Sequence, residues 1–290
     1  MHGPRLWLGL ALLSGLLSVA HADDIQLTDS MIADKIEDEL LFDPGVRSHR
    51  VDVSTTEGIV TLEGRVPSLL DKVRAKELAS TVRGVRGIVD RLTVKPTAMD
   101  DEVLHGHVTA ALLEDPATDS YEVEVKAKSG LIMISGEVDS YAERILCERV
   151  VSGVKGVTAV ENTIVVNYRE QRPDAEILAD VEEKLAWDAL IDEGLIKVKV
   201  DQGQVRLTGA VGTLAEKRRV DFAAHVAGVN SVVVKGLKLQ DWAKDADLRD
   251  PAHVIKSDSE IAKAIEDALL YDPRCLSFKI EVSVADGVAT

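Results

Sequence analysis

The chain has 290 residues and a formal net charge of −16 at pH 7, with 34 lysines and arginines against 50 acidic residues. This balance argues against nucleic-acid binding, because such binding depends largely on neutralisation of phosphates by Lys and Arg. It also disfavours anionic membranes, unless a locally basic patch supplies the attraction. The two cysteines, Cys147 and Cys275, are too few for a disulfide framework, and the sequence leaves open whether they are free or bridged.

The N-terminus has the pattern of an export signal. Arg5 precedes an apolar run from Leu6 to Ala20, and Ala20-His21-Ala22 is a small-x-small cleavage site. The run is shorter than the roughly 20 apolar residues that a membrane-spanning helix needs. We therefore expect residues 1–22 to be a signal peptide that is cleaved after Ala22, and the mature protein to be periplasmic.

After the signal, one pattern occurs four times: a capped amphipathic helix, an acidic turn and a strand pair marked by glycine. Apolar residues recur in each copy at the spacing of one helix face. They are Ile32, Ile36 and Leu40; Leu104, Val108 and Leu112; Ile177, Val181 and Leu185; and Ile261, Ile265 and Leu269. The same interval leads from the first of each set to a glycine, at Gly58, Gly130, Gly203 and Gly287. A repeat held in register in this way predicts a tandem array of small modules.

Each complete copy predicts an α-β-β-α-β module. A hairpin follows the first helix, and its turn glycine (Gly58, Gly130 or Gly203) is expected to have a positive φ. A second helix, with Ala75 and Leu78 on its apolar face in the first copy, ends at a glycine and leads into a last strand. The glycines at the helix ends are Gly84, Gly156 and Gly228. The predicted fold class is α+β, with a three-stranded sheet and both helices packed on one of its faces.

The repeats predict domains at 27–95, 99–167 and 172–240, then a linker at 241–256 and a partial fourth copy at 257–290. The linker is polar and contains Pro251, and the sequence leaves open whether it is flexible or docked. The fourth copy stops after its turn glycine, where the second strand of a module begins. We expect it to be a truncated module that is either the least stable part of the chain or packed against a neighbouring module, with a gene that continues past Thr290.

A further glycine falls within the second strand of each copy. The segments are Leu62-Glu63-Gly64-Arg65-Val66, Ile134-Ser135-Gly136-Glu137-Val138 and Leu207-Thr208-Gly209-Ala210-Val211. With the later Gly-Val-x-x-Val strands, they resemble the BON domain family over nearly the whole chain after the signal. The resemblance implies an exported, non-enzymatic module associated with envelope maintenance and phospholipid binding. The alternative, favoured by the strong acidity, is a protein-interaction or chaperone-like module that binds other exported envelope polypeptides.

No catalytic, cofactor or metal motif accompanies the repeats. His105 and His107 are two apart on a helix, so they point in different directions and do not form a chelating pair. No G-x-S-x-G nucleophile motif occurs, and the repeat glycines lack a phosphate-binding spacing. The sequence therefore predicts no enzyme, no cofactor and no small-molecule substrate. Cys147 occupies the place of Ala75, which favours a buried apolar role for its side chain.

One stretch departs from the acidic background. Between residues 65 and 95 basic residues outnumber acidic ones, and Lys72, Lys76 and Arg83 are spaced to share one stripe of the second helix, with Arg86 close by. These four are candidate contacts for phospholipid headgroups, each worth roughly 1 kcal/mol near an anionic surface. The other interpretation is a solvated flank that balances the acidic first helix. The candidate partners are thus a phospholipid membrane surface or other envelope proteins.

Overall fold

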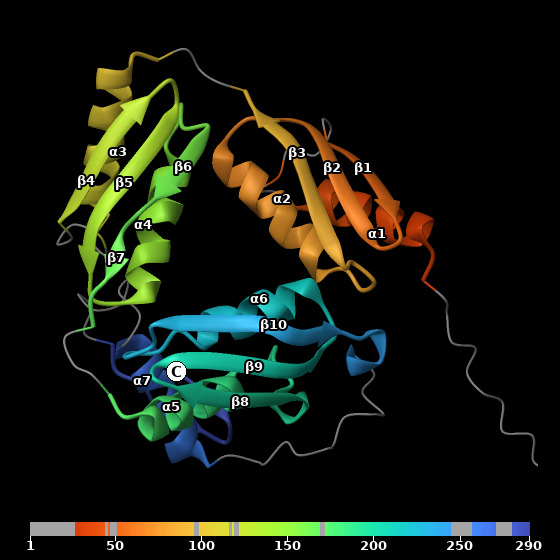
Figure 1. Ribbon diagram of the computed structural model, residues 1–290, viewed down its shortest axis with the longest axis vertical. Coiled ribbons are helices and arrows are strands. Elements are labelled where there is room, and N and C mark those ends of the chain that lie inside the picture. Colours follow the sequence, from red (N-terminus) through yellow and green to blue (C-terminus); the bar gives the residue numbers. More distant parts are fainter. Residues whose placement is uncertain are drawn as a thin grey trace, which may run out of the picture.

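The computed structural model describes residues 27–43, 46, 51–95, 99–115, 118, 122–168, 172–244, 257–270 and 280–290. The predicted signal peptide, Cys275 and most of the predicted linker lie outside these residues. Within them, three αββαβ modules follow one another, and a helix with a short hairpin comes last (Figure 1). The predicted α+β class is confirmed, because each module combines two helices with a sheet, which has three strands in the first and third modules and four in the second.

The first module shows how the repeat folds. Its elements are α1 (Asp29–Phe42), β1 (Val51–Thr56), β2 (Ile59–Val66), α2 (Leu69–Thr81) and β3 (Gly87–Val94). β2 lies in the middle of the sheet, antiparallel to β1 and parallel to β3. The predicted stripe of Ile32, Ile36 and Leu40 is at most 4% exposed and shares one core with Ala75 and Ala79 of α2. Burying each large aliphatic side chain stabilises the module by roughly 1.5–3 kcal/mol.

The second and third modules repeat this order with changes in the last strand. The second comprises α3 (Asp101–Glu114), β4 (Val123–Lys128), β5 (Leu131–Val138), α4 (Tyr141–Gly153), β6 (Ala159–Asn162) and β7 (Val165–Val166). The third comprises α5 (Asp174–Trp187), η2 (Glu193–Leu195), β8 (Ile196–Asp201), β9 (Gln204–Val211), α6 (Leu214–Ala223), β10 (Ser231–Leu239) and η3 (Asp241–Lys244), where η marks a 3-10 helix. β6 and β7 are two halves of one strand beside β5, and β10 has a register shift against β9.

The fourth copy is a helix and a hairpin, α7 (Asp258–Leu270), β11 (Val284–Ala285) and β12 (Val288–Ala289). A capping box begins α7, because Ser257 and Glu260 each accept a hydrogen bond from the backbone amide of the other. Ile261, Ile265 and Leu269 correspond to the buried stripe of α1 but are only partly buried. The described residues of this copy include no counterpart of α2 or β3, the elements that cover the stripe in the first module.

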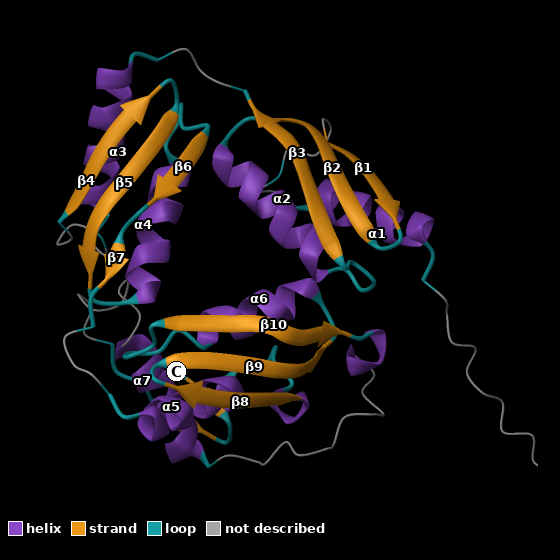
Figure 2. Ribbon diagram, in the orientation of Figure 1, coloured by secondary structure: helices purple, strands orange, loops and turns teal. Residues whose placement is uncertain are grey.

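The three modules are arranged as a triangle, with their second helices toward the centre (Figure 2). The first residue of each second helix contacts the next module in cyclic order. Leu69 of α2 packs against the core of the second module, and Leu214 of α6 packs against the core of the first. Tyr141 of α4 stacks on His225 of the third module, with 3.7 Å between ring centroids, and also contacts Phe222. One repeated position therefore contributes to all three joints.

Candidate functional site

A carboxylate clasp joins the first helix of every copy to its hairpin turn. In the first module, the Asp29 carboxylate accepts hydrogen bonds from the backbone amides of Glu57 and Gly58, at 2.8 and 2.9 Å. The equivalent contacts are Asp101 with Ser129, Asp174 with Gln202 and Gly203, and Asp258 with Asp286 and Gly287. Because all four copies use their first helical aspartate in this way, the clasp is part of the fold.

The clasp explains the shape of the hairpin turns. The predicted positive φ is observed at all three turn glycines, with 73° at Gly58, 83° at Gly130 and 72° at Gly203. The preceding residue also has a positive φ, 52° at Glu57, so the two central residues match a type I′ turn. A non-glycine residue rarely adopts this conformation. The two hydrogen bonds that Asp29 accepts stabilise this turn and satisfy the backbone amides of Glu57 and Gly58.

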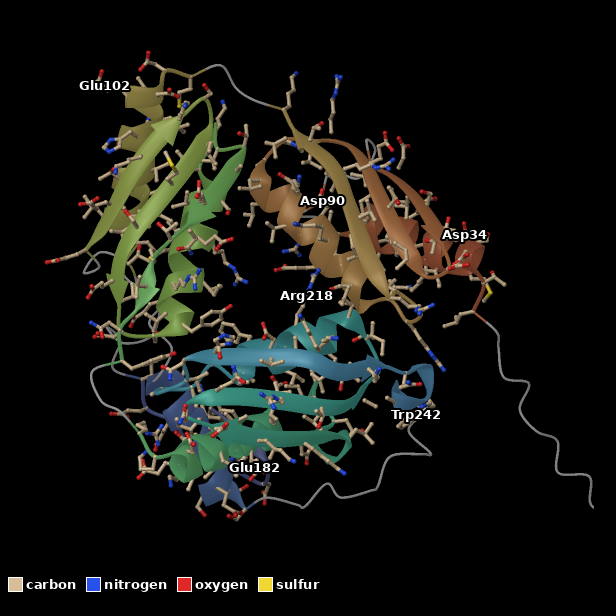
Figure 3. The ribbon with its side chains drawn as sticks, in the orientation of Figure 1. Asp34, Asp90, Glu102, Glu182, Arg218 and Trp242 are labelled. Carbon is tan, nitrogen blue, oxygen red and sulfur yellow. The ribbon has the colours of Figure 1, made fainter. Side chains whose placement is uncertain are left out.

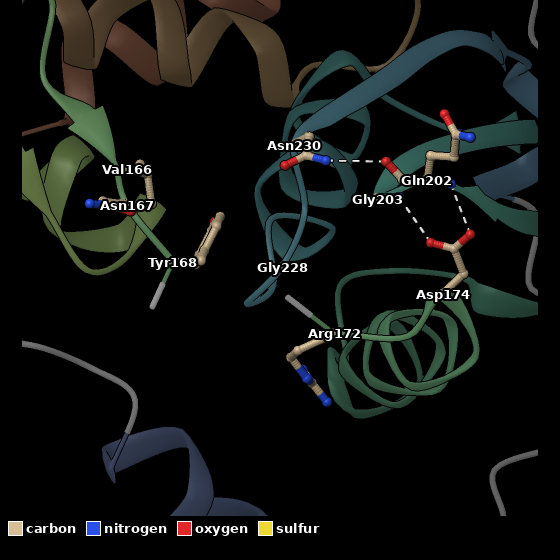
Figure 4. Close-up of a pocket in the computed structure, with 9 residues that line it drawn as sticks. All are labelled: Val166, Asn167, Tyr168, Arg172, Asp174, Gln202, Gly203, Gly228 and Asn230. Carbon is tan, nitrogen blue, oxygen red and sulfur yellow. Dashed lines mark hydrogen bonds between the residues drawn. The ribbon is translucent and has the colours of Figure 1, made fainter. Parts of the chain in front are cut away.

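A hollow of about 460 Å³ lies beside the clasp of the third module (Figure 4). Its lining includes Asp174, which holds the turn, and Asn230, which donates to the Gln202 carbonyl at 3.1 Å. Arg172, at the other side of the hollow, is paired with Asp180 of α5. Both charged side chains in the lining therefore already have partners within the module.

Two of the predicted headgroup residues bind a carboxylate of their own module. Lys72 and Lys76 of α2 both lie 3.2 Å from Asp90 of β3, labelled in Figure 3, and Lys72 also donates to the Leu92 carbonyl at 2.6 Å. Burial alone would raise the pKa of Asp90. Hydrogen bonds from Lys72, the Leu92 amide and Lys76 nevertheless hold that pKa below its ordinary value.

The contact from Lys72 is a repeated latch between the second helix and the third strand. Arg144 of α4 donates to the Asn162 carbonyl at 3.2 Å, and Lys217 of α6 donates to the Leu237 carbonyl at 2.8 Å. These cations stand at equivalent places in the three modules. A cation at this position therefore satisfies a strand carbonyl, whatever else it contacts.

The other two predicted residues, Arg83 and Arg86, form no such ion pair within the part of the chain that the structure describes. α2 ends at Thr81, so Arg83 and Arg86 lie beyond it, and the expectation of a helical stripe that includes Arg83 is wrong. The helix stops early because the chain turns into β3 after Val82, whose amide caps the last turn. Both arginines are exposed, and neither forms an ion pair with another described residue.

Two hollows adjoin these arginines. One, of about 230 Å³, lies between α1 and the end of α2, where Leu27, Met31 and Val82 give it an apolar lining and Arg83 stands at its edge. The other, of about 380 Å³, is lined in part by Arg86 and shares Leu27 with the first. Apolar surface and Arg83 thus meet at the first hollow, whereas the second, beside Arg86, is also lined by Asp29 and Glu57.

The remaining candidate groups have structural surroundings. Cys147 is fully buried and unbridged, and desolvation together with the nearby Glu143 raises the pKa of its thiol to about 12. His105 and His107 are both exposed on α3. No group of residues suited to a metal ion is found in the part of the chain that the structure describes. A search of the same residues finds no helix that is long and apolar enough to cross a membrane.

Sequence reasoning missed the clasp and the joint between modules. The clasp had a signal, since an aspartate stands at the first helical position of every copy. The joint had almost no signal in the sequence, because Leu69, Tyr141 and Leu214 have in common only a large, mostly apolar side chain. At the Tyr141 joint, burial lowers the pKa of His225 and raises that of Asp221.

Comparison with known families agrees with this geometry. The model of the BON domain matches residues 28–96, 100–168 and 173–241, which contain the three αββαβ modules. The chain belongs to the BON domain family. These ranges lie one residue later than the bounds predicted from the sequence, and the fourth copy falls outside them.

Three curated relatives share about half of this chain. Osmotically-inducible protein Y of Escherichia coli (strain K12) is 30% identical over 145 residues, which are 48% of this chain and 72% of that protein. The 21 kDa hemolysin of Actinobacillus pleuropneumoniae is 25% identical over 142 residues, 47% and 73% of the two chains. The outer membrane lipoprotein DolP of Haemophilus influenzae is 27% identical over 143 residues, 47% and 74% of the two chains.

Proposed function

We propose that this chain is an exported, non-enzymatic protein of the bacterial envelope that binds phospholipid surfaces and supports the envelope under osmotic stress. The names of two relatives, an osmotically inducible protein and an outer membrane lipoprotein, support a location in the envelope and a role under osmotic stress. The predicted signal peptide supports a periplasmic location. The absence of a catalytic motif in the sequence supports a binding role.

One observation carries the lipid contact: the apolar hollow of the first module with Arg83 at its edge. A guanidinium beside apolar surface suits a lipid headgroup, since the cation pairs with the phosphate and the apolar wall accepts the start of an acyl chain. Arg86, which forms no ion pair with a described residue, adds a second cation at the adjoining hollow. Lys72 and Lys76, predicted with them, are held at Asp90 and contribute less, because their charge is partly compensated.

Vesicle binding by charge-reversed variants tests this proposal. Arg83→Glu with Arg86→Glu should weaken binding to phosphatidylglycerol vesicles by more than ten-fold, since each cation contributes roughly 1 kcal/mol. Arg65→Glu with Lys95→Glu makes the same change of net charge on exposed residues of the same module and is the matched control. Equal binding by the two variants would refute a contact at Arg83 and Arg86. Failure of the wild-type protein to bind would refute the function itself.

A second candidate function, binding of other exported polypeptides, rests on exposed apolar side chains. Leu41 and Phe42 at the end of α1 are 65% and 80% exposed, and Leu113 of α3 and Leu190 are also more than half exposed. Replacing Leu41 and Phe42 by Ser should abolish any ability of the protein to suppress aggregation of an unfolded client. An unchanged effect of this variant would remove the observation that favours the second function.

A further inference from the structure

Each module leaves one face of its sheet open, because both helices pack on the opposite face. Side chains alternate along a strand, so every second residue of β8, β9 and β10 points to this outer face in the third module. Val198 and Val200 of β8 pack against the core, which places Lys197 and Lys199 on the outside. The outer faces of the three modules can therefore be compared position by position.

The outer face of the third module is basic. Its exposed charged residues are five cations and one carboxylate, namely Lys197, Lys199, Arg206, Lys235, Lys238 and Asp201. None of the five cations forms an ion pair with another described residue. We call these five residues the basic sheet face. It is an uncompensated positive surface on a chain whose net charge is −16.

The corresponding faces of the other two modules are balanced. In the first module the exposed charges of the outer face on the strands are those of Asp52, Glu63, Arg65 and Arg91, and Glu63 forms an ion pair with Arg91 across β2 and β3 at 3.8 Å. In the second, the exposed charges of the outer face are those of Lys126, Lys128, Glu124, Glu137 and Glu161. The basic sheet face is thus a property of the third module and not of the fold.

The arrangement of cations in the basic sheet face lowers the stability of the third module. Lys199 lies directly opposite Arg206 in the β8–β9 register, and like charges at such positions repel each other. Lysines on an edge strand protect it from pairing with other chains, which accounts for Lys197 and Lys199 on β8 and for Lys235 and Lys238 on β10. Edge protection does not account for Arg206, since β9 is the central strand. A local conflict without internal compensation is typical of a functional surface.

We infer that the basic sheet face docks on an anionic phospholipid bilayer, as a second contact besides the hollow of the first module. The face spans three strands, and none of its five residues lines a hollow described above, which suits a flat partner. Four of its five cations are lysines, which are depleted in protein interfaces but common on faces that lie on membranes.

An aromatic residue stands at the end of this face. Trp242 of η3 is 44% exposed, and η3 follows β10 and contacts β9 (Figure 3). Trp is enriched at membrane–water interfaces, where its ring lies at headgroup level. Val233, which pairs with Arg206 across the strands, adds an apolar side chain within the face. The inference rests on the proposed function for its ligand, an anionic phospholipid, but places the contact on a different module.

The test compares two double variants of the full chain on vesicles of equal parts phosphatidylglycerol and phosphatidylcholine. Lys197→Gln with Lys199→Gln removes two exposed lysines from the edge strand β8. Lys126→Gln with Lys128→Gln removes two from the equivalent strand β4 and changes the net charge equally. The first variant should bind about 25-fold more weakly than wild type, at roughly five-fold per lysine, and the control should bind nearly as well as wild type.

Trp242 fluorescence gives a second measurement. In a Trp187→Phe background of the chain from Asp23 onward, which lacks Trp7, emission from Trp242 should shift to shorter wavelength when anionic vesicles are added, and the shift should disappear in the Lys197/Lys199 variant. If both double variants bind equally weakly, or if the β8 variant binds as well as wild type, the inference that the basic sheet face docks on the bilayer is overturned. Loss of binding only with Arg83 and Arg86 replaced would leave the proposed function standing and overturn this inference. If wild type does not bind, both fail.

Discussion

The first and third modules share their internal contacts and differ on their surfaces. Asp29 and Asp174 hold equivalent turns, and Lys72 and Lys217 donate to equivalent strand carbonyls. Outside, the first module balances its sheet charges and has an apolar hollow beside Arg83, whereas the third carries on its sheet five cations that form no ion pair with a described residue. The residues that repeat maintain the fold, and the surfaces that do not repeat are where function is to be sought.

The largest expected effect tests the shared interior. Leu62 and Leu207 occupy equivalent places on β2 and β9, and both are fully buried. Replacing either by Ala should lower the free energy of unfolding of its module by about 2–5 kcal/mol. Hydrogen exchange resolved by module measures this, because several modules need not unfold as one unit. Markedly different losses at the two sites would break the equivalence of the two cores.

The clasp should give a smaller and equal loss in both modules. Asp29→Ala and Asp174→Ala each leave two turn amides without their carboxylate, which we expect to cost roughly 1–3 kcal/mol. Amide exchange at Gly58 and Gly203 should speed up locally. Asp29→Asn, which retains one acceptor oxygen, is the control and should lose less. Unchanged exchange at both glycines would show that the turns do not need the clasp.

The smallest expected effect is a loss of stability at low pH that occurs in the first module and not in the third. The folded state lowers the pKa of Asp90, so its contribution to stability is present above the unfolded-state pKa and is lost as pH falls through the folded-state pKa. Lys217 of the third module forms no such ion pair with a described residue. Asp90→Asn should cost the first module roughly 1 kcal/mol at pH 7 and almost nothing once the pH is well below the lowered folded-state pKa of Asp90. A pH-independent cost would assign Asp90 a role unrelated to its charge.

The repeat made most of the fold predictable. Three or four copies of one stripe, such as Ile32, Ile36 and Leu40, indicate the helices and their buried faces, and Gly58 indicates the turn. These signals are local, because helix periodicity and positive φ depend on neighbouring residues. The αββαβ order and the two-layer packing follow from them.

The site was less predictable because its contacts are distant in sequence. Whether Lys72 faces solvent or Asp90 depends on how β3 returns beside β2, and no spacing within α2 reveals it. The charge of the basic sheet face is likewise divided among three strands, so no single strand of the third module reveals it. Arg83 was placed on the helix because the apolar pattern runs on to Val82, although α2 ends at Thr81.

The central claim is that an acidic protein binds an anionic lipid surface through local cations, and sedimentation with vesicles tests it most directly. The wild-type protein, from Asp23 onward, should pellet with phosphatidylglycerol vesicles at low ionic strength and be released as salt is raised, because screening shortens the reach of these charges. It should not pellet with pure phosphatidylcholine. Absence of pelleting with phosphatidylglycerol, or equal pelleting with both lipids at every salt concentration, would contradict the account.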